Sequence, residues 1–227
     1  MTIHFRNEVH SLKQKIVELS GQVEDQLHRA VESIRCRDAK LASSVLDSDH
    51  SIDLAEVRLE EECLKILALH QPVAHDLRFI VAVLKINNDL ERIGDLAVNI
   101  AERAIFLASD TMPGTEYDFS SMANKTSAMV RESLDALLRE DVQLAAHVRE
   151  SDNEVDEDHR NMYEQIKKSI RQAPQHLDAL IHLLSISRNL ERIADHATNI
   201  AEDVIYLYKG EIVRHRFDSD GGTVPHS

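Results

Sequence analysis

The chain has 227 residues and a formal net charge of −14 at pH 7, and this acidity argues against nucleic acid as the main partner because phosphates would be repelled. Aromatic residues make up only 4% of the chain, Trp is absent, and Gly and Pro are few, which disfavours a β-rich fold. With 43% apolar residues, the chain suits one large or two small domains built from long helices.

Apolar residues recur at alternating spacings of three and four, the pattern of amphipathic helices. Asp38 follows a break in this pattern and can cap the second helix, which ends before Pro72 because the residue preceding a proline is pushed out of the α region. Asp141 and Pro174 stand at the corresponding places in the second half. The predicted helices cover residues 4–36, 39–69, the segment from Pro72 to Ser109, 118–139, 142–172, and the segment from Pro174 to Gly210.

Two similar stretches lie in the third and sixth helices, NDLERIGDLAVNIAERAIF at 88–106 and RNLERIADHATNIAEDVIY at 188–206. Polar as well as apolar positions agree, so packing alone does not explain the likeness. An internal duplication is the simplest account. It predicts an all-α fold of two tandem three-helix bundles of long antiparallel helices. The first bundle would occupy residues 1–110 and the second 111–210, with a boundary at Asp110–Thr115 and a fraying tail at 211–227.

The outer side of each of these two helices changes character along its length. Successive residues are about 100° apart around a helix, which defines the residues that share this outer side. The side begins with apolar residues, so we expect the start of each helix to pack on two sides. It then continues as a row of oxygen-bearing side chains. The apolar starts are Leu77, Val81 and Leu84, and Leu177, Ile181 and Leu184. The first acidic row is Glu91, Asp95, Asn99 and Glu102, and the second acidic row is Glu191, Asp195, Asn199 and Glu202.

Carboxylates four residues apart on a helix lie one above the other and repel by a few tenths of a kcal/mol. Arg92 and Arg103 could offset part of this repulsion, and a bound cation would offset more. Oxygen ligands suit hard cations such as Mg²⁺, Ca²⁺, Mn²⁺ and ferric iron. The sequence therefore predicts a cation site on each row, and an ordinary solvated acidic face is the alternative.

A second acidic pair appears in each half when the halves are aligned. Asp49 and Asp53 in the second helix match Asp152 and Asp156 in the fifth. In a three-helix bundle these pairs either approach the acidic rows and complete oxygen-rich sites, or remain solvated surface positions. His159 could add a nitrogen ligand to the second site, whereas His196 is expected to be an exposed or packing histidine.

Several familiar chemistries lack their signatures. Carboxylate-bridged iron enzymes need Glu-x-x-His on two helices, and no such motif accompanies either row. There is no Walker loop, GxGxxG or HExxH, and we expect no enzyme. Cys36 and Cys63 are expected to be buried free thiols. The N-terminal sequence shows no secretory signal, and the most apolar run, residues 79–86, is too short to span a bilayer, so we expect a soluble cytoplasmic protein.

Four segments resemble the PhoU family of phosphate-signalling regulators: LERIGDLAVNIAER, LERIADHATNIAEDVIY, HQPVAHDLRFI and HFRNEVHSLKQKI. The resemblance extends to Gly210. It implies two three-helix bundles related by a pseudo-twofold axis. It also implies multinuclear metal sites at the repeated E-x-x-x-D motif, which is Glu91/Asp95 and Glu191/Asp195 here, for iron, zinc, manganese or magnesium.

The resemblance also implies a negative regulator of the phosphate-starvation response. Such a protein would be a cytoplasmic adaptor that links the ATPase subunit of a phosphate-specific ABC transporter to a membrane sensor histidine kinase, reaching the membrane only through these partners. A homodimer is expected, and Leu77, Val81 and Leu84 would serve either inter-domain packing or self-association. The competing functions are a metal-dependent hydrolase or oxidase using the same carboxylates, and a structural interaction protein that binds no metal.

Overall fold

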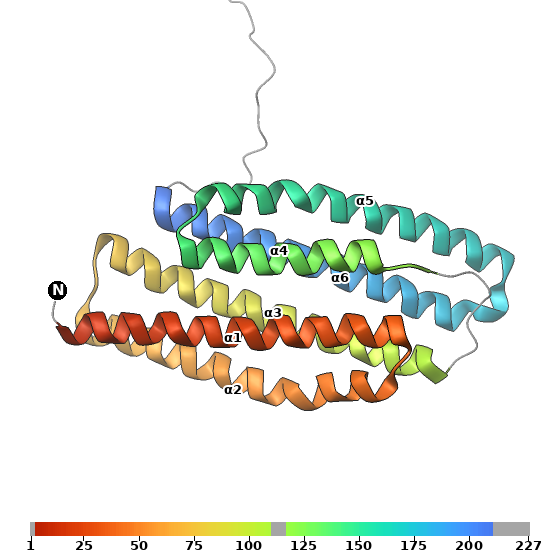
Figure 1. Ribbon diagram of the computed structural model, residues 1–227, viewed down its shortest axis with the longest axis horizontal. Coiled ribbons are helices and arrows are strands. Elements are labelled where there is room, and N and C mark those ends of the chain that lie inside the picture. The colour runs from red at the N-terminus through yellow and green to blue at the C-terminus, as the bar shows by residue number, and fades with distance from the viewer. Residues whose placement is uncertain (1–2, 110–116, 211–227) are drawn as a thin grey trace, which may run out of the picture.

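The computed structural model describes residues 3–109 and 117–210, and these ranges contain long helices and no strand. The first half forms α1 (Ile3–Cys36), α2 (Ala39–His70) and α3 (Ala74–Ser109), and the second forms α4 (Ser120–Arg139), α5 (Val142–Gln172) and α6 (Leu177–Lys209), with a 3₁₀ turn at Pro174–His176. Each half is an antiparallel three-helix bundle, and the two lie side by side (Figure 1). The predicted fold class is confirmed. The predicted boundary at Asp110–Thr115 and the tail at 211–227 lie outside the described residues.

Equivalent residues turn the chain between the first two helices of each half. Arg37 and Glu140 adopt left-handed backbone conformations, with φ of 51° and 59°, and an aspartate follows each. Asp38 Oδ1 accepts hydrogen bonds from the N–H groups of Lys40 and Leu41, at 2.9 and 3.1 Å. Asp141 Oδ1 does the same for the corresponding N–H groups, at 2.9 and 3.0 Å. These are the two predicted caps, and their near-identical geometry agrees with the duplication.

The core follows the apolar stripes predicted for α3 and α6, all of whose residues are buried. These residues are Phe79, Val83, Ile86, Leu90, Ile93, Ala97, Ile100 and Ala104, and Ala179, Leu183, Ile186, Leu190, Ile193, Ala197, Ile200 and Val204. In α1, Leu12, Ile16, Leu19, Val23 and Leu27 pack inward with the same three- and four-residue spacing. Gly21 interrupts that pattern without ending the helix.

The halves meet mainly where α3 packs antiparallel to α6, with a smaller contact between α1 and α4. His196 Nδ1 lies 2.8 Å from Asp89 Oδ1, and Lys85 Nζ lies 3.0 Å from Asp203 Oδ1. At the far end of α3, the ring of Phe106 stacks on His182 at 3.9 Å between centroids. His196 is therefore a half-buried residue of the seam between the halves, consistent with the packing role expected for it.

Two expectations about exposure are wrong. The first turns of α3 and α6 are not packed on two sides, because Leu77, Leu177 and Ile181 are 40%, 42% and 51% exposed. Further along the same side the expectation holds in part, since Val81 is half-buried and Leu84 and Leu184 pack against the core. The start of α3 contacts the end of α6 through a polar interaction, in which Arg78 Nε donates a hydrogen bond to the Leu207 carbonyl at 3.4 Å. Cys36 is exposed rather than buried because it is the last residue of α1, whereas Cys63 is buried as expected. Self-association through the exposed apolar residues stays a prediction.

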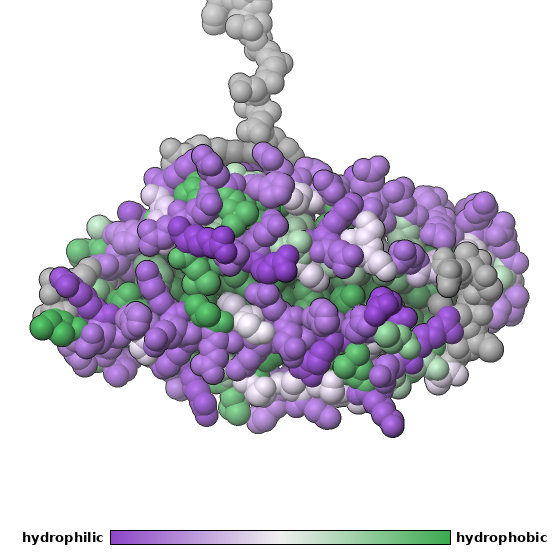
Figure 2. All heavy atoms as spheres, in the orientation of Figure 1, coloured by the Kyte–Doolittle hydropathy of each residue, from purple (hydrophilic) through white to green (hydrophobic). Residues whose placement is uncertain are grey.

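The surface is mostly polar. Figure 2 shows hydrophilic residues over most of one face, with apolar side chains visible between them. Among the helices that the structure describes, none is both long enough and apolar enough to cross a membrane.

Candidate cation sites along the acidic rows

Both acidic rows are half-buried over much of their length rather than standing clear in solvent. Glu91, Asp95 and Asn99 are intermediate in exposure and Glu102 is exposed, whereas in the second row only Asp195 is exposed. The rows face α2 and α5, because the charges that act most strongly on them include aspartates of those helices. The prediction that the rows occupy a free outer face therefore needs correction: a neighbouring helix partly covers each one.

The first acidic cluster consists of Asp49 and Asp53 from α2 with Glu91 and Asp95 from α3. Burial raises the pKa of Glu91, and the charges of Asp95, Asp53 and Asp49 raise it further against the opposing charge of Arg92. Burial also raises the pKa of Asp49, together with the charges of Asp53 and Asp95 and against a hydrogen bond from Gln26. The two pairs that sequence alignment of the halves singled out thus lie close together in this half.

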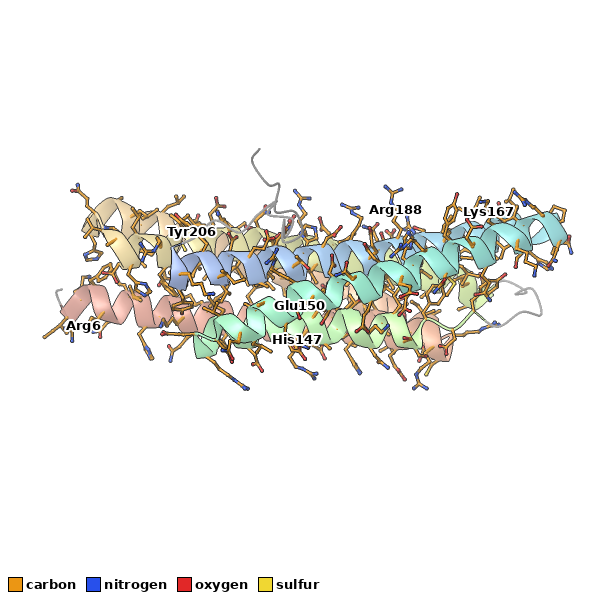
Figure 3. The ribbon with its side chains drawn as sticks, turned by 90° about the horizontal axis from the view of Figure 1, so that it is seen from above. Arg6, His147, Glu150, Lys167, Arg188 and Tyr206 are labelled. Atoms are coloured by element: carbon orange, nitrogen blue, oxygen red, sulfur yellow. The ribbon has the colours of Figure 1, made fainter. Side chains whose placement is uncertain are left out.

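The second acidic cluster consists of Asp152 and Asp156 from α5 with Glu191 and Asp195 from α6. Burial and the charges of Asp195 and Asp156 raise the pKa of Asp152 to about 6. Burial and the same-sign neighbours also raise the pKa values of Glu191 and Asp195. Arg188, which Figure 3 labels on α6, opposes the shift at Glu191 without cancelling it. Each half therefore gathers four carboxylates in equivalent places.

Basic residues neutralise the clusters only in part. Arg92 reaches both carboxylates of its row, with 3.2 Å from Nε to Glu91 Oε2 and 3.5 Å from Nη1 to Asp95 Oδ2, but its side chain is 52% exposed. In the part of the chain that the structure describes, no Lys or Arg nitrogen comes within 4.0 Å of a carboxylate oxygen of Glu191 or Asp195. Repulsion between half-buried like charges therefore persists, more so in the second cluster.

The later members of each row point to other partners. Glu102 pairs with Arg103 beside it, and Glu202 Oε1 lies 3.4 Å from Arg149 Nε. Asn199 Nδ2 donates at 3.5 Å to Asp89 in the seam between the halves. Asn99 is half-buried on α3. The structure thus brings eight of the twelve predicted ligands into two clusters and gives Glu102, Asn199 and Glu202 contacts outside them.

Sequence reasoning did not single out the hydrogen bonds that border the clusters. In the first half, Asn87 is buried and its Nδ2 donates to the carbonyl and carboxylate of Glu56, at 3.1 and 3.0 Å. In the second half, Ser187 Oγ lies 2.8 Å from His159 Nδ1 at the equivalent place. These pairs fix α2 on α3 and α5 on α6. The aligned halves contain the signal, because both pairs have the same relative positions.

The donor set fits a hard cation, because each cluster offers carboxylate oxygens whose mutual repulsion a positive ion would relieve. Within the described residues, Gln26 Oε1 is a buried acceptor without a hydrogen-bond partner, and the amide nitrogen of the same side chain donates to Asp49 in the first cluster. Among the described residues, however, no three ligand atoms of either cluster lie within 4.8 Å of one another. The carboxylates would have to turn toward a common ion, so the metal-ligand role of the clusters stays a prediction.

Comparison with known proteins agrees with the internal repeat. The family model of the PhoU domain matches the chain twice, over residues 16–104 and 119–204. A phosphate-specific transport system accessory protein PhoU homolog of Pseudomonas aeruginosa is 37% identical over 93% of this chain and 88% of its own length, and one of Aquifex aeolicus is 37% identical over 95% and 97%.

Solved structures agree as well. The crystal structure of PhoU from Pseudomonas aeruginosa matches with a TM-score of 0.89 and 36% identity, covering 91% of this chain and 100% of that one. That of the phosphate transport system regulatory protein PhoU from Streptococcus pneumoniae matches with a TM-score of 0.86 and 27% identity, covering 92% and 99%.

Proposed function

The chain belongs to the PhoU family and has a regulatory role associated with phosphate transport, and from this premise we propose that it is a metal-binding adaptor between a transporter and a kinase. On one side it would engage the ATPase subunit of a phosphate-specific ABC transporter, and on the other a membrane sensor histidine kinase. Its output would be repression of the phosphate-starvation response. It would work in the cytoplasm at the inner face of the membrane and reach the membrane only through these partners.

The observation that carries this proposal is the pair of equivalent four-carboxylate clusters. Burial and neighbouring like charge raise the pKa values of Glu91, Asp152, Glu191 and Asp195, so the folded protein pays a free-energy cost to keep these carboxylates charged side by side. Proteins keep such arrangements where they serve a site more often than where they only support the fold. A bound cation would offset much of the negative charge of each cluster and draw the two helices that form it toward one geometry.

Metal binding would connect the clusters to signalling through shape and charge. Without a cation, each cluster presents negative charge where α2 lies beside α3 or where α5 lies beside α6. With one, that charge is reduced and the two helices are joined. We propose that the cation-loaded form is the docking surface, and that the state of the transporter decides whether the kinase engages it. Inorganic phosphate would reach so acidic a surface only through a bound metal.

Capture of the transporter ATPase subunit by the full-length chain tests the proposal. The test variant carries Glu191→Gln and Asp195→Asn, and the control carries Glu150→Gln and Glu157→Gln, which remove the same charge from exposed positions on α5. We expect the chain and the control to retain the subunit after chelation and re-addition of Mn²⁺, and the test variant to lose most of it. In cells, the test variant should also lose repression of a phosphate-starvation reporter. Equal capture and repression by test and control variants would overturn the adaptor role of the clusters.

A further inference from the structure

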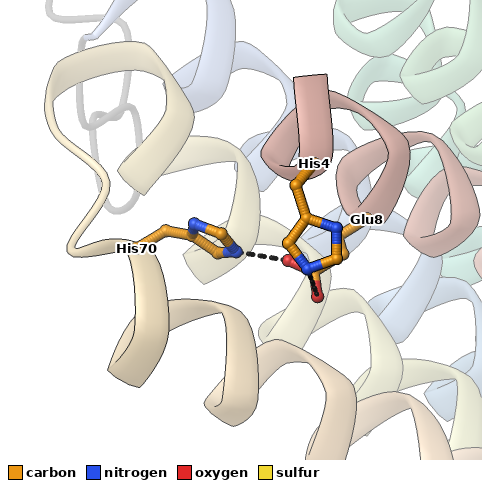
Figure 4. A group of neighbouring side chains, drawn as sticks. All are labelled: His4, Glu8 and His70. Carbon is orange, nitrogen blue, oxygen red and sulfur yellow. Dashed lines mark hydrogen bonds and ion pairs between the residues drawn. The ribbon is translucent and has the colours of Figure 1, made fainter. Parts of the chain in front are cut away.

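A group of metal-ligating side chains lies outside both acidic clusters, where the start of α1 meets the end of α2. His4 and Glu8 are one helical turn apart on α1, and His70 is the last residue of α2 (Figure 4). One ligand atom from each residue lies within 4.8 Å of the others, and in the described residues this is the only group of three His, Cys, Asp or Glu side chains that meets this condition. Residues 66 positions apart in the chain thus converge on one point.

The carboxylate of Glu8 lies between the two imidazole rings. His4 Nε2 is 3.5 Å from Glu8 Oε1, and His70 Nε2 contacts Glu8 Oε2 directly. Lys65 Nζ lies 3.7 Å from Glu8 Oε1 as well. Burial favours the neutral acid, but the contacts with His70, His4 and Lys65 outweigh it and hold the pKa of Glu8 below its ordinary value. The Glu8 carboxylate therefore lies where it could share one ion with both imidazole rings.

The surrounding structure fixes two of the three side chains. The side chains of Glu8 and His70 are only 13% and 17% exposed, and the ring of His70 packs edge-on against the buried Phe5, with 5.2 Å between centroids. Gln71, in a left-handed conformation with φ of 45°, ends α2 directly after His70. His4 is 74% exposed and free to turn toward the other two. A half-formed site of two fixed ligands and one adjustable ligand can close on an ion with little rearrangement.

We propose that His4, Glu8 and His70 bind a divalent transition metal, with Zn²⁺ as the best match, which fastens the start of α1 to the end of α2. Two imidazole nitrogens and one carboxylate are a set of three protein ligands typical of zinc, and they leave a fourth position for water or a partner's side chain. Imidazole nitrogen does not suit Mg²⁺ or Ca²⁺, so this site differs in metal preference from the all-oxygen clusters. Bonds of about 2.0–2.2 Å place tetrahedral ligands roughly 3.3–3.5 Å apart, close to the present separation of His4 and Glu8.

The proposal is independent of the adaptor function, and Co²⁺ tests it because a tetrahedral site gives that ion a visible absorption band. Full-length protein would be freed of metal with a chelator and titrated with Co²⁺ in excess Mg²⁺, which competes for the oxygen-only clusters. Variants His4→Ala and His70→Ala remove one ligand each. The matched control is His10→Ala, an exposed histidine on the same helix. Competition by Zn²⁺ then reports the preferred ion.

We expect the unchanged chain and the control to bind one Co²⁺ with a tetrahedral spectrum that Zn²⁺ abolishes. Both test variants should lose the band, and their affinity for Co²⁺ should fall at least tenfold. His4 is largely exposed, so His4→Ala keeps the fold and its result stands even if His70→Ala loosens the end of α2. A band of equal strength in His4→Ala, or the absence of any band in the unchanged chain, overturns the site and leaves an ordinary ion pair of Glu8 with His70.

Discussion

Replacing Asp152 by Asn should stabilise the metal-free protein while weakening its second acidic cluster. The folded structure raises the pKa of this carboxyl from 3.8 to about 6, mainly through burial and then through Asp195 and Asp156. A rise in pKa of this size corresponds to roughly 3 kcal/mol for an unscreened group. Because Asp152 is only half-buried, screening by solvent leaves about 1 kcal/mol, which Asn would recover.

The pH dependence gives the sign of this effect. The folded protein holds the Asp152 proton more tightly than the unfolded chain does, so stability falls as the pH rises from about 4 to about 6 and is level above that. Asp152→Asn should remove this fall. At pH 7.5 with chelator, the change of about 1 kcal/mol should raise the melting temperature by about 2–4 °C for a chain of this size.

Thermal unfolding followed by circular dichroism measures the effect at pH 4.5 and pH 7.5, with chelator and with added Mn²⁺. Glu157→Gln is the control, because it removes an equal charge from an exposed position on the same helix. Added Mn²⁺ should stabilise the unchanged chain and the control more than Asp152→Asn. A melting temperature that falls or stays level in metal-free Asp152→Asn at pH 7.5, or that rises equally in the control, would refute the reasoning from like-charge repulsion.

Six further substitutions test the helix caps, the packing and the seam between the halves. Asp38→Ala and Asp141→Ala should each lower the free energy of unfolding by about 1 kcal/mol, equally within error in urea denaturation, because each removes the same cap. Gly94→Ala should lower the free energy of unfolding by about 1 kcal/mol, since the new Cβ would lie 3.1 Å from Gln26 Oε1. Adding Gln26→Met to this variant should restore stability, because the second half has Met129 and Ala194 at the equivalent positions. Lys85→Met should cost about 2 kcal/mol by removing one charged partner of the buried Asp203, whereas Lys65→Met, which removes a more exposed lysine, should cost much less.

The sequence predicted what depends on local pattern. The buried stripes of α3 and α6 follow from three- and four-residue spacing, and the caps at Asp38 and Asp141 follow from the position of an aspartate after a break. Alignment of the halves left two alternatives for Asp49 and Asp152, a place beside the acidic rows or a solvated surface position. The first was possible because the third helix of a three-helix bundle runs back alongside the second. The electrostatic proximity of these aspartates to Asp95 and Asp195 favours that alternative.

Features that depend on contacts between helices could not be predicted from the sequence. The pairing of Asp89 with His196 requires the antiparallel crossing of α3 and α6, which no single-helix pattern contains. The exposure of Ile181 was missed because periodicity gives the side of a helix on which a residue lies and not whether another element covers it. His4 and His70 come together because the start of α1 lies beside the end of α2, and the spacing of residues along the chain does not establish this alignment.

Elemental analysis of the purified chain tests the central claim, that the two acidic clusters hold metal, most directly. The chain would be compared with a variant carrying Glu91→Ala, Asp95→Ala, Glu191→Ala and Asp195→Ala, with both proteins also carrying His4→Ala so that only the clusters are counted. The account predicts bound metal in the first protein and its loss from the second, with the helical spectrum unchanged. Equal metal content in the two proteins, or none in the first after exposure to Mn²⁺, Zn²⁺, Mg²⁺ and iron, would contradict it.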